Sequence, residues 1–597
     1  MDLAIMEPQR FLITTSDQRC WRDDEPILFL GEWCTWNIES EVLAGFDFEI
    51  ASPYGWENGQ READYQYVWD VIEQILPEIS QMLNQHHGTN HSQRYWRIML
   101  GTWLYRFTMI LFNRWATVQH VLVKYSLSSA MVIEFPKNQM VPMDYISFAR
   151  MHRLDSWNQA IYGKILKEWS NVSCTVKQGE ALDEGKMSDL VHFTPPPPRL
   201  FKARVKKNIA SVVQRFSTLL TRSTDAFLIS TYLPFLQECK LHLSLRQLPV
   251  PRLLEPTPIA YPNTPVRESL CLDSDRFTGF EKFIRTLIPE HIPICYLEGY
   301  QALCEKAESM PWPAKPKFIF TSNSFDGDEV FKVWVATKTE LGIPYIIGQH
   351  GANYGAGKFT PSEIHEVATA DRFLTWGWDG DNPKFYSFGA FPLISKSAGK
   401  YNPKGGLLLV QRGGGHREAL WDETAAFRNY LEDQFKFVGC LSSQVIKKLS
   451  VRLYSAYLYA NWSEDKMWKR HFPLVDIDYG TTPIGDRILQ SRLIVFSYES
   501  TGVLELLAGN VPMLFFYNSN NWPLRSEVEH YYDLLIEVGI FHSSAESAAQ
   551  KVNEIWDDVS SWWGKDDVQK ARKEFCGQFV RMPQHPIREL KKALLSI

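Results

Sequence analysis

One stretch near the middle of the chain restricts the fold more than any other. Residues 317–322 (KFIFTS) form a short apolar run typical of a strand, and residues 329–341 (EVFKVWVATKTEL) place apolar side chains on one helical face. Gly342 ends that helix, and residues 344–349 (PYIIGQ) predict a second strand. A strand, a helix and a strand in this order predict a parallel pair with a right-handed crossover.

The same order of elements returns in the last third of the chain. A polar, glycine-rich stretch at 395–406 is interpreted as a domain linker, and the apolar run at 406–410 leads into the glycine-rich loop QRGGGH. Further strands and one helix are predicted at 473–480, 492–498, 503–510 and 511–517. We therefore predict an α/β protein with two Rossmann-like domains, residues 1–394 and 395–597, facing a cleft.

The N-terminal domain is predicted to carry a helical and proline-rich insertion. Strands are expected at 26–34 and 129–135, with a helical region from 63 to 118 between them. The run TPPPP at 194–198 is a stiff spacer, and a basic amphipathic segment follows at 199–222. We interpret that segment as a helix with a solvated basic face; the alternative is contact with an anionic membrane surface or an anionic substrate.

Composition excludes several classes of protein. A chain of 597 residues is too long for one core, and a net charge of −6 does not favour nucleic-acid binding. The nine cysteines show no C-x-x-C and no Cys/His ligand spacing, which argues against a zinc site and fits a reducing compartment. The N-terminus lacks a signal-peptide pattern, and arginines interrupt the most apolar long stretch, so we expect a cytoplasmic protein.

Three loops follow predicted strands and should lie at the carboxyl ends of those strands, where ligands bind to such sheets. Asn323–Asp328 and Gln349–Gly357 share one edge of the first sheet, and Glu499–Gly502 belongs to the second domain. Two domains that face each other would bring these edges to a common cleft, which is a frequent position for a ligand.

The loop of the second domain is suited to hold a phosphate. Ser497, Ser500 and Thr501 lie between an apolar strand and the start of a helix, where backbone N–H groups and hydroxyls can bind an anion. Glu505 can accept hydrogen bonds from ribose hydroxyls, and Arg412 can neutralise a donor phosphate. The alternatives are an ordinary Ser/Thr helix cap and, for Arg412, a solvated surface position.

In the first domain, Asp326 and Asp328 offer carboxylates at the strand end. The triplet D-G-D resembles a metal motif, but a chain with 69 acidic residues produces such triplets by chance, so we expect no metal cofactor. Asp328 either caps the helix that starts at Glu329 or acts as a base or nucleophile. A cap and a catalyst are compatible, and the choice between the two aspartates stays open.

The third loop, GQHGANYGAGKF, superficially resembles a phosphate-binding P-loop. That pattern fails because Ala352 stands where glycine is required and Phe359 where a hydroxyl is required. Its candidate residues are instead Gln349, His350 and Gly351, with His350 as a general acid or base or as a donor to a phosphate. The alternative is a histidine satisfied within the protein surface. Further titratable groups follow at Glu363, His365 and Glu366.

Three segments together are similar to one known family. They are FLITTSDQRCW with PILFLGEWC, DEVFKVWVATKTELGIPYIIGQHGANYG with ATADRFLTWGW, and SYESTGVLELLAGNVPMLFFY. The chain resembles the transferase family that is encoded in bacterial lipopolysaccharide O-antigen gene clusters and was first named from a Leptospira locus. More remotely, the layout looks like GT-B glycosyltransferases that transfer Kdo or sialic-acid-type sugars from CMP donors.

The resemblance implies roles for individual residues. A carboxylate (Asp328 or Asp326), a strand-end histidine (His350) and a Ser/Thr loop (Ser500 and Thr501) would match those of the CMP-sugar enzymes, although Gly351 stands where several of them have proline. The expected function is glycosyl transfer from a nucleotide sugar, CMP-linked by preference, to a glycan or lipid-linked glycan acceptor. The rival hypotheses are a nucleotide-sugar epimerase, which shares the layout, and a non-catalytic nucleotide-sugar-binding component of an assembly complex.

Overall fold

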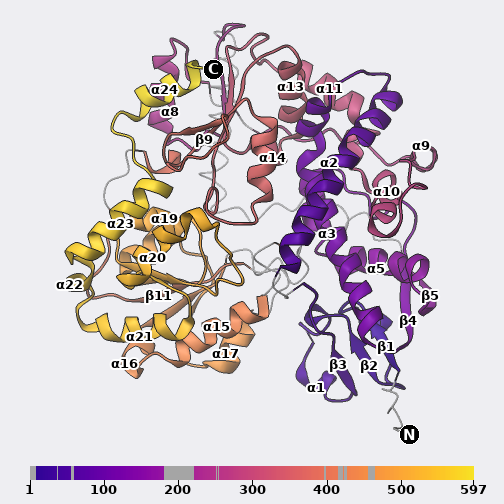
Figure 1. The fold of residues 1–597 in the computed structure, drawn as a ribbon, viewed down its shortest axis with the longest axis horizontal. Coiled ribbons are helices and arrows are strands. Elements are labelled where there is room, and N and C mark those ends of the chain that lie inside the picture. The colour runs from indigo at the N-terminus through magenta and orange to yellow at the C-terminus, as the bar shows by residue number, and fades with distance from the viewer. Residues whose placement is uncertain are drawn as a thin grey trace.

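The computed structural model describes residues 9–36, 38–55, 59–180, 221–250, 252, 254–394, 399–413, 421, 427–454 and 464–597. The predicted proline run at 194–198, nearly all of the basic segment at 199–222 and the start of the linker at 395–398 lie outside these residues. Within the described part, the strands form three sheets, and every strand pair in them is parallel (Figure 1).

The three sheets follow one another along the chain. The N-terminal sheet has the order β3-β2-β1-β4-β5, from β1 (Arg10–Ile13), β2 (Ile27–Phe29), β3 (Phe48–Ile50), β4 (Leu127–Glu134) and β5 (Ser173–Gln178). The middle sheet has the order β10-β9-β8-β7-β6, from β6 (Phe227–Ile229), β7 (Ile319–Thr321), β8 (Tyr345–Gly348), β9 (Arg372–Thr375) and β10 (Phe385–Ser387). The C-terminal sheet has the order β13-β12-β11-β14-β15-β16, from β11 (Gly406–Val410), β12 (Leu449–Arg452), β13 (Asp476–Asp478), β14 (Ser491–Phe496), β15 (Met513–Phe516) and β16 (Phe541–His542).

Helices connect and cover these sheets. The first half of the chain contributes α1 (Ser40–Leu43), α2 (Gln60–His87), α3 (Gln93–Lys124), α4 (Tyr145–Met151), α5 (Asp155–Trp169), α8 (Phe235–Ser244), α9 (Thr264–Ser269), α10 (Gly279–His291) and α11 (Tyr300–Glu308). The second half contributes α12 (Ser324–Gly327), α13 (Glu329–Glu340), α14 (Pro361–Thr369), α15 (Phe427–Gly439), α16 (Ser443–Ile446), α17 (Glu464–His471), α18 (Ile484–Gln490), α19 (Thr501–Ala508), α20 (Glu529–Glu537), α21 (Ala545–Ile555), α22 (Val559–Trp563), α23 (Asp566–Phe579) and α24 (Pro586–Leu595). Among the described residues, none of these helices has the length and apolarity needed to cross a bilayer.

The predicted strand–helix–strand unit is present as β7, α13 and β8, with Phe320 paired to Ile346 in a parallel register. The fold is therefore α/β with parallel sheets, as predicted. The separate N-terminal sheet was not distinguished in the sequence, because β1, β2 and β3 have only 4, 3 and 3 residues. Strands that short show no clear alternation of apolar and polar side chains.

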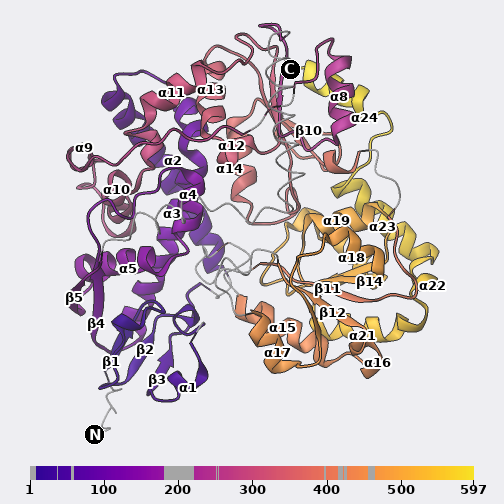
Figure 2. The same cartoon turned by 180° about the vertical axis from the view of Figure 1, so that it is seen from behind.

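The long hairpin of α2 and α3 lies between the N-terminal and middle sheets. Ser92 begins α3 by accepting the N–H of Tyr95 at 3.2 Å, and Gly88 ends α2 in a left-handed conformation with φ 64°. Because α2, α5, α13 and α14 all pack on α3, this helix is buried around most of its circumference. Figures 1 and 2 show this pair of helices running beside α13 and α14.

The middle sheet takes part in two hydrophobic cores. Phe227 and Ile347 face a core shared with the N-terminal sheet, α2, α3 and α10. Leu228 and Ile346, one position along each strand, face a second core shared with the C-terminal sheet, α8 and α24. Alternation along the strands thus makes this sheet a common wall between the two cores.

The end of the chain returns to the middle sheet. The N–H of Arg581 donates to the carbonyl of Trp376 at 2.7 Å, and Arg372 of β9 donates to the carbonyl of Ala593 in α24 at 2.7 Å. Figure 1 shows α24 lying beside α8 next to this sheet. The last helix therefore covers strands that are about 200 residues earlier in the sequence.

Candidate functional site

The carboxyl ends of the middle and C-terminal sheets meet at two of the predicted loops. The N–H of Ala352, in the loop after β8, donates to Oγ1 of Thr501 at the start of α19 over 3.2 Å. These two residues are 149 positions apart in the sequence. A Cβ added to Gly351 would meet Thr501 Oγ1 no closer than 3.8 Å, so the backbone beside His350 stays uncrowded. The structure therefore brings together the loop Gln349–Gly357, called the histidine loop below, and the loop Glu499–Gly502, called the phosphate loop after its predicted role.

Contacts from both sides hold the histidine loop in place. Glu363 of α14 accepts the N–H of Gly355 at 2.7 Å and the guanidinium of Arg525 at 2.9 Å. Arg525, which follows β15, also donates to the carbonyl of Gly357 at 3.0 Å. Leu524 forms an antiparallel bridge with the same glycine. Because Glu363 is only 5% exposed, this ion pair fixes the loop with little competition from water.

Gln349 shapes the loop from inside. Its Oε1 accepts the N–H of Trp376 and the indole N–H of Trp378, both at 2.8 Å, while its Nε2 donates to the carbonyl of Gly351 at 2.8 Å. The side chain is 1% exposed. Its amide is thus committed to the turn that presents His350, which gives Gln349 a positioning role.

His350 is placed between a buried carboxylate and a tyrosine. Its Nδ1 lies 3.7 Å from Oε2 of Glu366 and 3.2 Å from the hydroxyl of Tyr354. That hydroxyl donates to the other oxygen of Glu366 at 2.6 Å. The imidazole is 27% exposed and Glu366 is 0% exposed, so the histidine has an open side and an anchored side. Burial acts to lower the pKa of His350, but the Glu366 carboxylate outweighs it, with Asp326 adding to the rise, and the pKa is raised.

Asp326 belongs to the same electrostatic cluster. It lies half-buried in α12, the short helix that follows β7 in the sequence. Its charge acts on His350 and on Arg106 and Tyr145. Gly327 follows it and packs against α4, where an added Cβ would approach Ile146 Cδ1 to 2.7 Å. Close packing therefore fixes the position of Asp326 beside the histidine loop.

Asp328 is the N-cap of α13, as the sequence suggested. Oδ1 accepts the N–H of Phe331 at 2.9 Å, and the residue is 1% exposed. Burial raises the pKa of Asp328 to about 7. Its Oδ2 has no hydrogen-bond partner among the described residues. Its capping role is thus established, whereas its catalytic role stays a prediction.

The phosphate loop contains a buried hydroxyl that has no hydrogen-bond partner among the described residues. Ser500 occupies the N-cap position of α19 but makes no capping hydrogen bond, and its Oγ is buried without a partner in the described part of the chain. A Cβ on Gly502 would come within 2.8 Å of the Phe496 ring and 3.3 Å of Ser500 Oγ. A side chain at Gly502 would therefore displace the Phe496 ring at the start of α19, and the ordinary side-chain cap predicted as the alternative is absent at Ser500.

The remaining predicted donor residues have differing surroundings. Ser497 is buried, contacts the Tyr430 hydroxyl at 2.8 Å and donates to Gln434 at 3.1 Å, so it stabilises the interior behind the loop. Arg412 is 3% exposed and lies over the rings of Tyr430 and Trp522 at 5.4 and 5.3 Å, which excludes a solvated surface position. Glu505 is half-buried on α19, one turn beyond Thr501.

The sequence pattern did not single out the carboxylates that support these loops. In the sequence Glu366 is one of three neighbouring titratable groups, and His365 beside it faces α3 instead, with Nε2 at 3.3 Å from Thr102 Oγ1. Burial lowers the pKa of His365 to about 3. Glu499, in the phosphate loop, accepts the hydroxyl of Tyr532 at 2.6 Å. Since α14 begins only at Pro361, sequence spacing alone could not show which of its faces meets His350.

A family model described as LIC12162 family transferase matches residues 10–594. The chain belongs to this family. Membership confirms the predicted resemblance and the predicted enzyme class, a transferase. Among the described residues, no group of three or more His, Cys, Asp or Glu is placed to hold a metal ion, and metal independence stays a prediction.

Other comparisons are distant. A search of curated proteins found no match. A variant of the wall teichoic acid polymerase TagF with CDPG aligns over 51% of this chain and 76% of its own, with 10% identity and a TM-score of 0.26. The Streptomyces sp. SF2575 glycosyltransferase SsfS6 aligns over 52% and 74%, with 13% identity and a TM-score of 0.24. Scores this low do not support a functional assignment.

Proposed function

We propose that this transferase is a glycosyltransferase that moves a sugar from a nucleotide-activated donor, CMP-linked by preference, to a growing O-antigen or related cell-surface glycan. The observation that carries the proposal is the contact between Ala352 and Thr501, because it joins a strand-end histidine loop to a strand-end hydroxyl loop. Such an arrangement suits a reaction in which one sheet holds the leaving phosphate and the other holds the reacting groups.

The donor phosphate would lie against the start of α19. Backbone N–H groups at a helix N-terminus favour an anion, and the buried hydroxyl of Ser500 has no partner among the described residues. The hydroxyl of Thr501 accepts from Ala352 and still has its own proton to donate. Arg412 adds a buried positive charge in the same domain.

The reacting groups would come from the middle sheet. The acceptor hydroxyl oxygen forms a bond to the anomeric carbon, the bond from that carbon to the phosphate oxygen breaks, and the electron pair leaves with the phosphate. Asp326 takes the acceptor proton, and protonated His350, held by Glu366, offsets the charge of the leaving phosphate. We assign the base to Asp326 rather than Asp328, since Asp328 is almost fully buried, whereas Asp326 is half-buried and its charge acts on His350.

A thermal-shift screen of the full chain against CMP, UDP, GDP and dTDP sugars tests donor binding. We expect one nucleotide class to raise the Tm and Thr501→Val to weaken that effect. No stabilisation by any of them contradicts the proposal. Conversion of the donor sugar without an acceptor would indicate an epimerase, and binding with no turnover in acceptor-containing extracts would indicate a non-catalytic component.

A further inference from the structure

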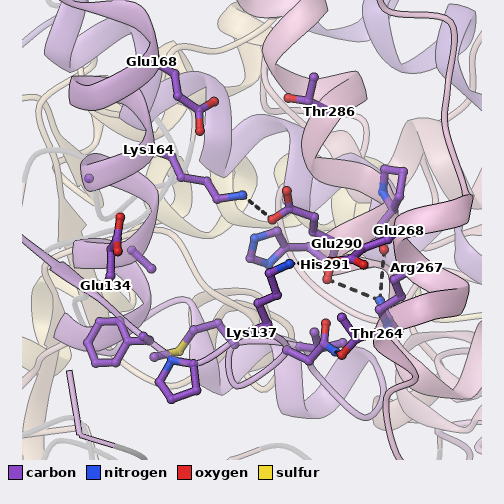
Figure 3. A pocket seen from close by; sticks show the side chains of 18 of the residues that line it. Glu134, Lys137, Lys164, Glu168, Thr264, Arg267, Glu268, Thr286, Glu290 and His291 are labelled. Atoms are coloured by element: carbon purple, nitrogen blue, oxygen red, sulfur yellow. Dashed lines mark hydrogen bonds and ion pairs between the residues drawn. The ribbon is translucent and has the colours of Figure 1, made fainter. Parts of the chain in front are cut away.

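A cavity of about 670 Å³ lies outside the site described above, against the N-terminal sheet (Figure 3). It is formed at the carboxyl end of β4 and closed by α5, α9 and α10. In this sheet β1 is flanked by β2 on one side and β4 on the other, so the chain reverses its direction of winding there. The cavity is lined from β4, β5 and the loop after β4 but not from β1, so it lies on the β5 side of that reversal.

The charges around the cavity are already balanced. Three lysines on its rim each form an ion pair with a glutamate: Lys137 with Glu268, Lys164 with Glu290 and Lys167 with Glu134. The two buried guanidiniums in its wall are held by carboxylates too, Arg267 by Glu298 at 2.7 Å and Arg285 by Glu78 at 2.8 Å. Since carboxylates match the cations, the rim does not favour a phosphate or a nucleotide.

Its interior combines apolar surface with one unsatisfied polar group. Val132, Met140, Ala160 and Leu272 contribute apolar wall. His291, the last residue of α10, is 6% exposed, and its Nδ1 is buried without a hydrogen bond of normal geometry in the described part of the protein, although the main chain of Met140 lies close enough to interact with the ring. Its ring packs near Phe107 and Trp157, with centroids 5.6 and 6.1 Å away, which holds the imidazole in place.

From these features we infer that the cavity is a binding site for a neutral saccharide, separate from the loops of His350 and Thr501. A sugar hydroxyl both donates and accepts, so it satisfies the Nδ1 of His291 in either tautomer. The paired Lys and Glu side chains on the rim offer donors and acceptors to further hydroxyls, and the C–H faces of a sugar ring suit the apolar wall. The inference stands apart from the proposed transfer reaction, because a carbohydrate held here need not react.

Saturation-transfer NMR on the full chain tests the site. The probes are neutral mono- to tetrasaccharides of glucose, galactose, N-acetylglucosamine and rhamnose, with inorganic phosphate and CMP as separate anionic probes. We expect signals from at least one saccharide and about tenfold weaker binding in His291→Phe, the loss that one hydrogen bond to a buried group produces.

Two further variants separate blockage of the cavity from general damage. Thr286 lies exposed on α10 at the mouth, and Thr286→Trp should block entry. Thr337→Trp is the matched control, since Thr337 is also exposed on a helix and also donates to a backbone carbonyl of the preceding turn at 2.8 Å. No saccharide signal, equal loss in both tryptophan variants, or phosphate or CMP binding that falls in His291→Phe would each overturn the inference. Unchanged saccharide binding in the presence of CMP is expected.

Discussion

Thr501 accepts the main-chain N–H of Ala352 through its side-chain oxygen, across 3.2 Å and between two different sheets. The bond leaves the threonine proton for another acceptor, which the proposed donor phosphate supplies. Thr501→Val keeps the shape and removes both interactions. We expect donor binding about tenfold weaker, measured by titration calorimetry. Thr501→Ser retains the hydroxyl and should stay within a few-fold of wild type; equal loss in both variants would point to packing instead.

The pH dependence of turnover should report on His350. The carboxylate of Glu366 raises the pKa of His350, so the imidazolium persists to higher pH than in an isolated histidine. If the charged form assists the leaving phosphate, activity falls as pH rises through that pKa. Glu366→Gln removes the negative charge and should move the fall to lower pH. A pH–rate profile of kcat measures the shift, and an unmoved profile would rule out this pairing.

The two aspartates should respond differently to amidation. Asp326→Asn removes the proposed base and should lower kcat by about 100-fold or more, with the fold unchanged by circular dichroism. Asp328→Asn keeps an oxygen to accept the N–H of Phe331 and should leave most of the turnover. The opposite ranking of the two variants would place the base at Asp328.

The raised pKa of Asp328 should make the stability of the protein depend on pH. Its folded-state pKa of about 7 lies above that of an unfolded aspartate, near 3.9, so the folded protein holds the proton longer. Stability contributed by the protonated carboxyl is therefore lost as pH rises from about 4 through 7. Asp328→Asn should raise the Tm at pH 8 and change it little at pH 4. Thermal denaturation at both pH values measures this, and a lower Tm at pH 8 would contradict it.

Arg525 should stabilise the histidine loop. Arg525→Met leaves Glu363, which is 5% exposed, without its guanidinium partner and should lower the free energy of unfolding by about 1–3 kcal/mol. The double variant Arg525→Met/Glu363→Gln removes the stranded charge while keeping an acceptor for the N–H of Gly355. Chemical denaturation should therefore show partial recovery in the double variant. Additive losses would mean that the two side chains act independently.

The sequence predicted the strand ends more accurately than the side-chain partners. Periodicity located β7, α13, β8 and β14 because each presents a clear apolar run bounded by glycine, proline or polar residues. Parallel pairing then placed Asp326 and His350 at one edge, as observed. The contact of Ala352 with Thr501 depends on how two sheets meet, and no local pattern records that.

The sequence also did not predict which polar side chains of the site are buried. The polar side chains of Ser497 and Gln349 predict ligand contacts, yet both side chains form hydrogen bonds within the protein. In the sequence nothing distinguishes Glu366 from an exposed glutamate on a helix. Its burial beside His350 becomes visible only once the path of the chain between β8 and α14 is known. Polar residues that position a loop and polar residues that contact a ligand are of the same types in the sequence. Only their burial in the folded protein distinguishes them.

The two-sided middle sheet has a consequence for any attempt to divide this protein. A polypeptide ending at residue 394 would lose α24 and would present Leu228, Ile346 and their neighbours to water on one whole face. The remainder, produced by itself, would lack the strands on which its last helix rests. Each half carries part of the other's interior, so either half produced alone should expose a large apolar surface and aggregate.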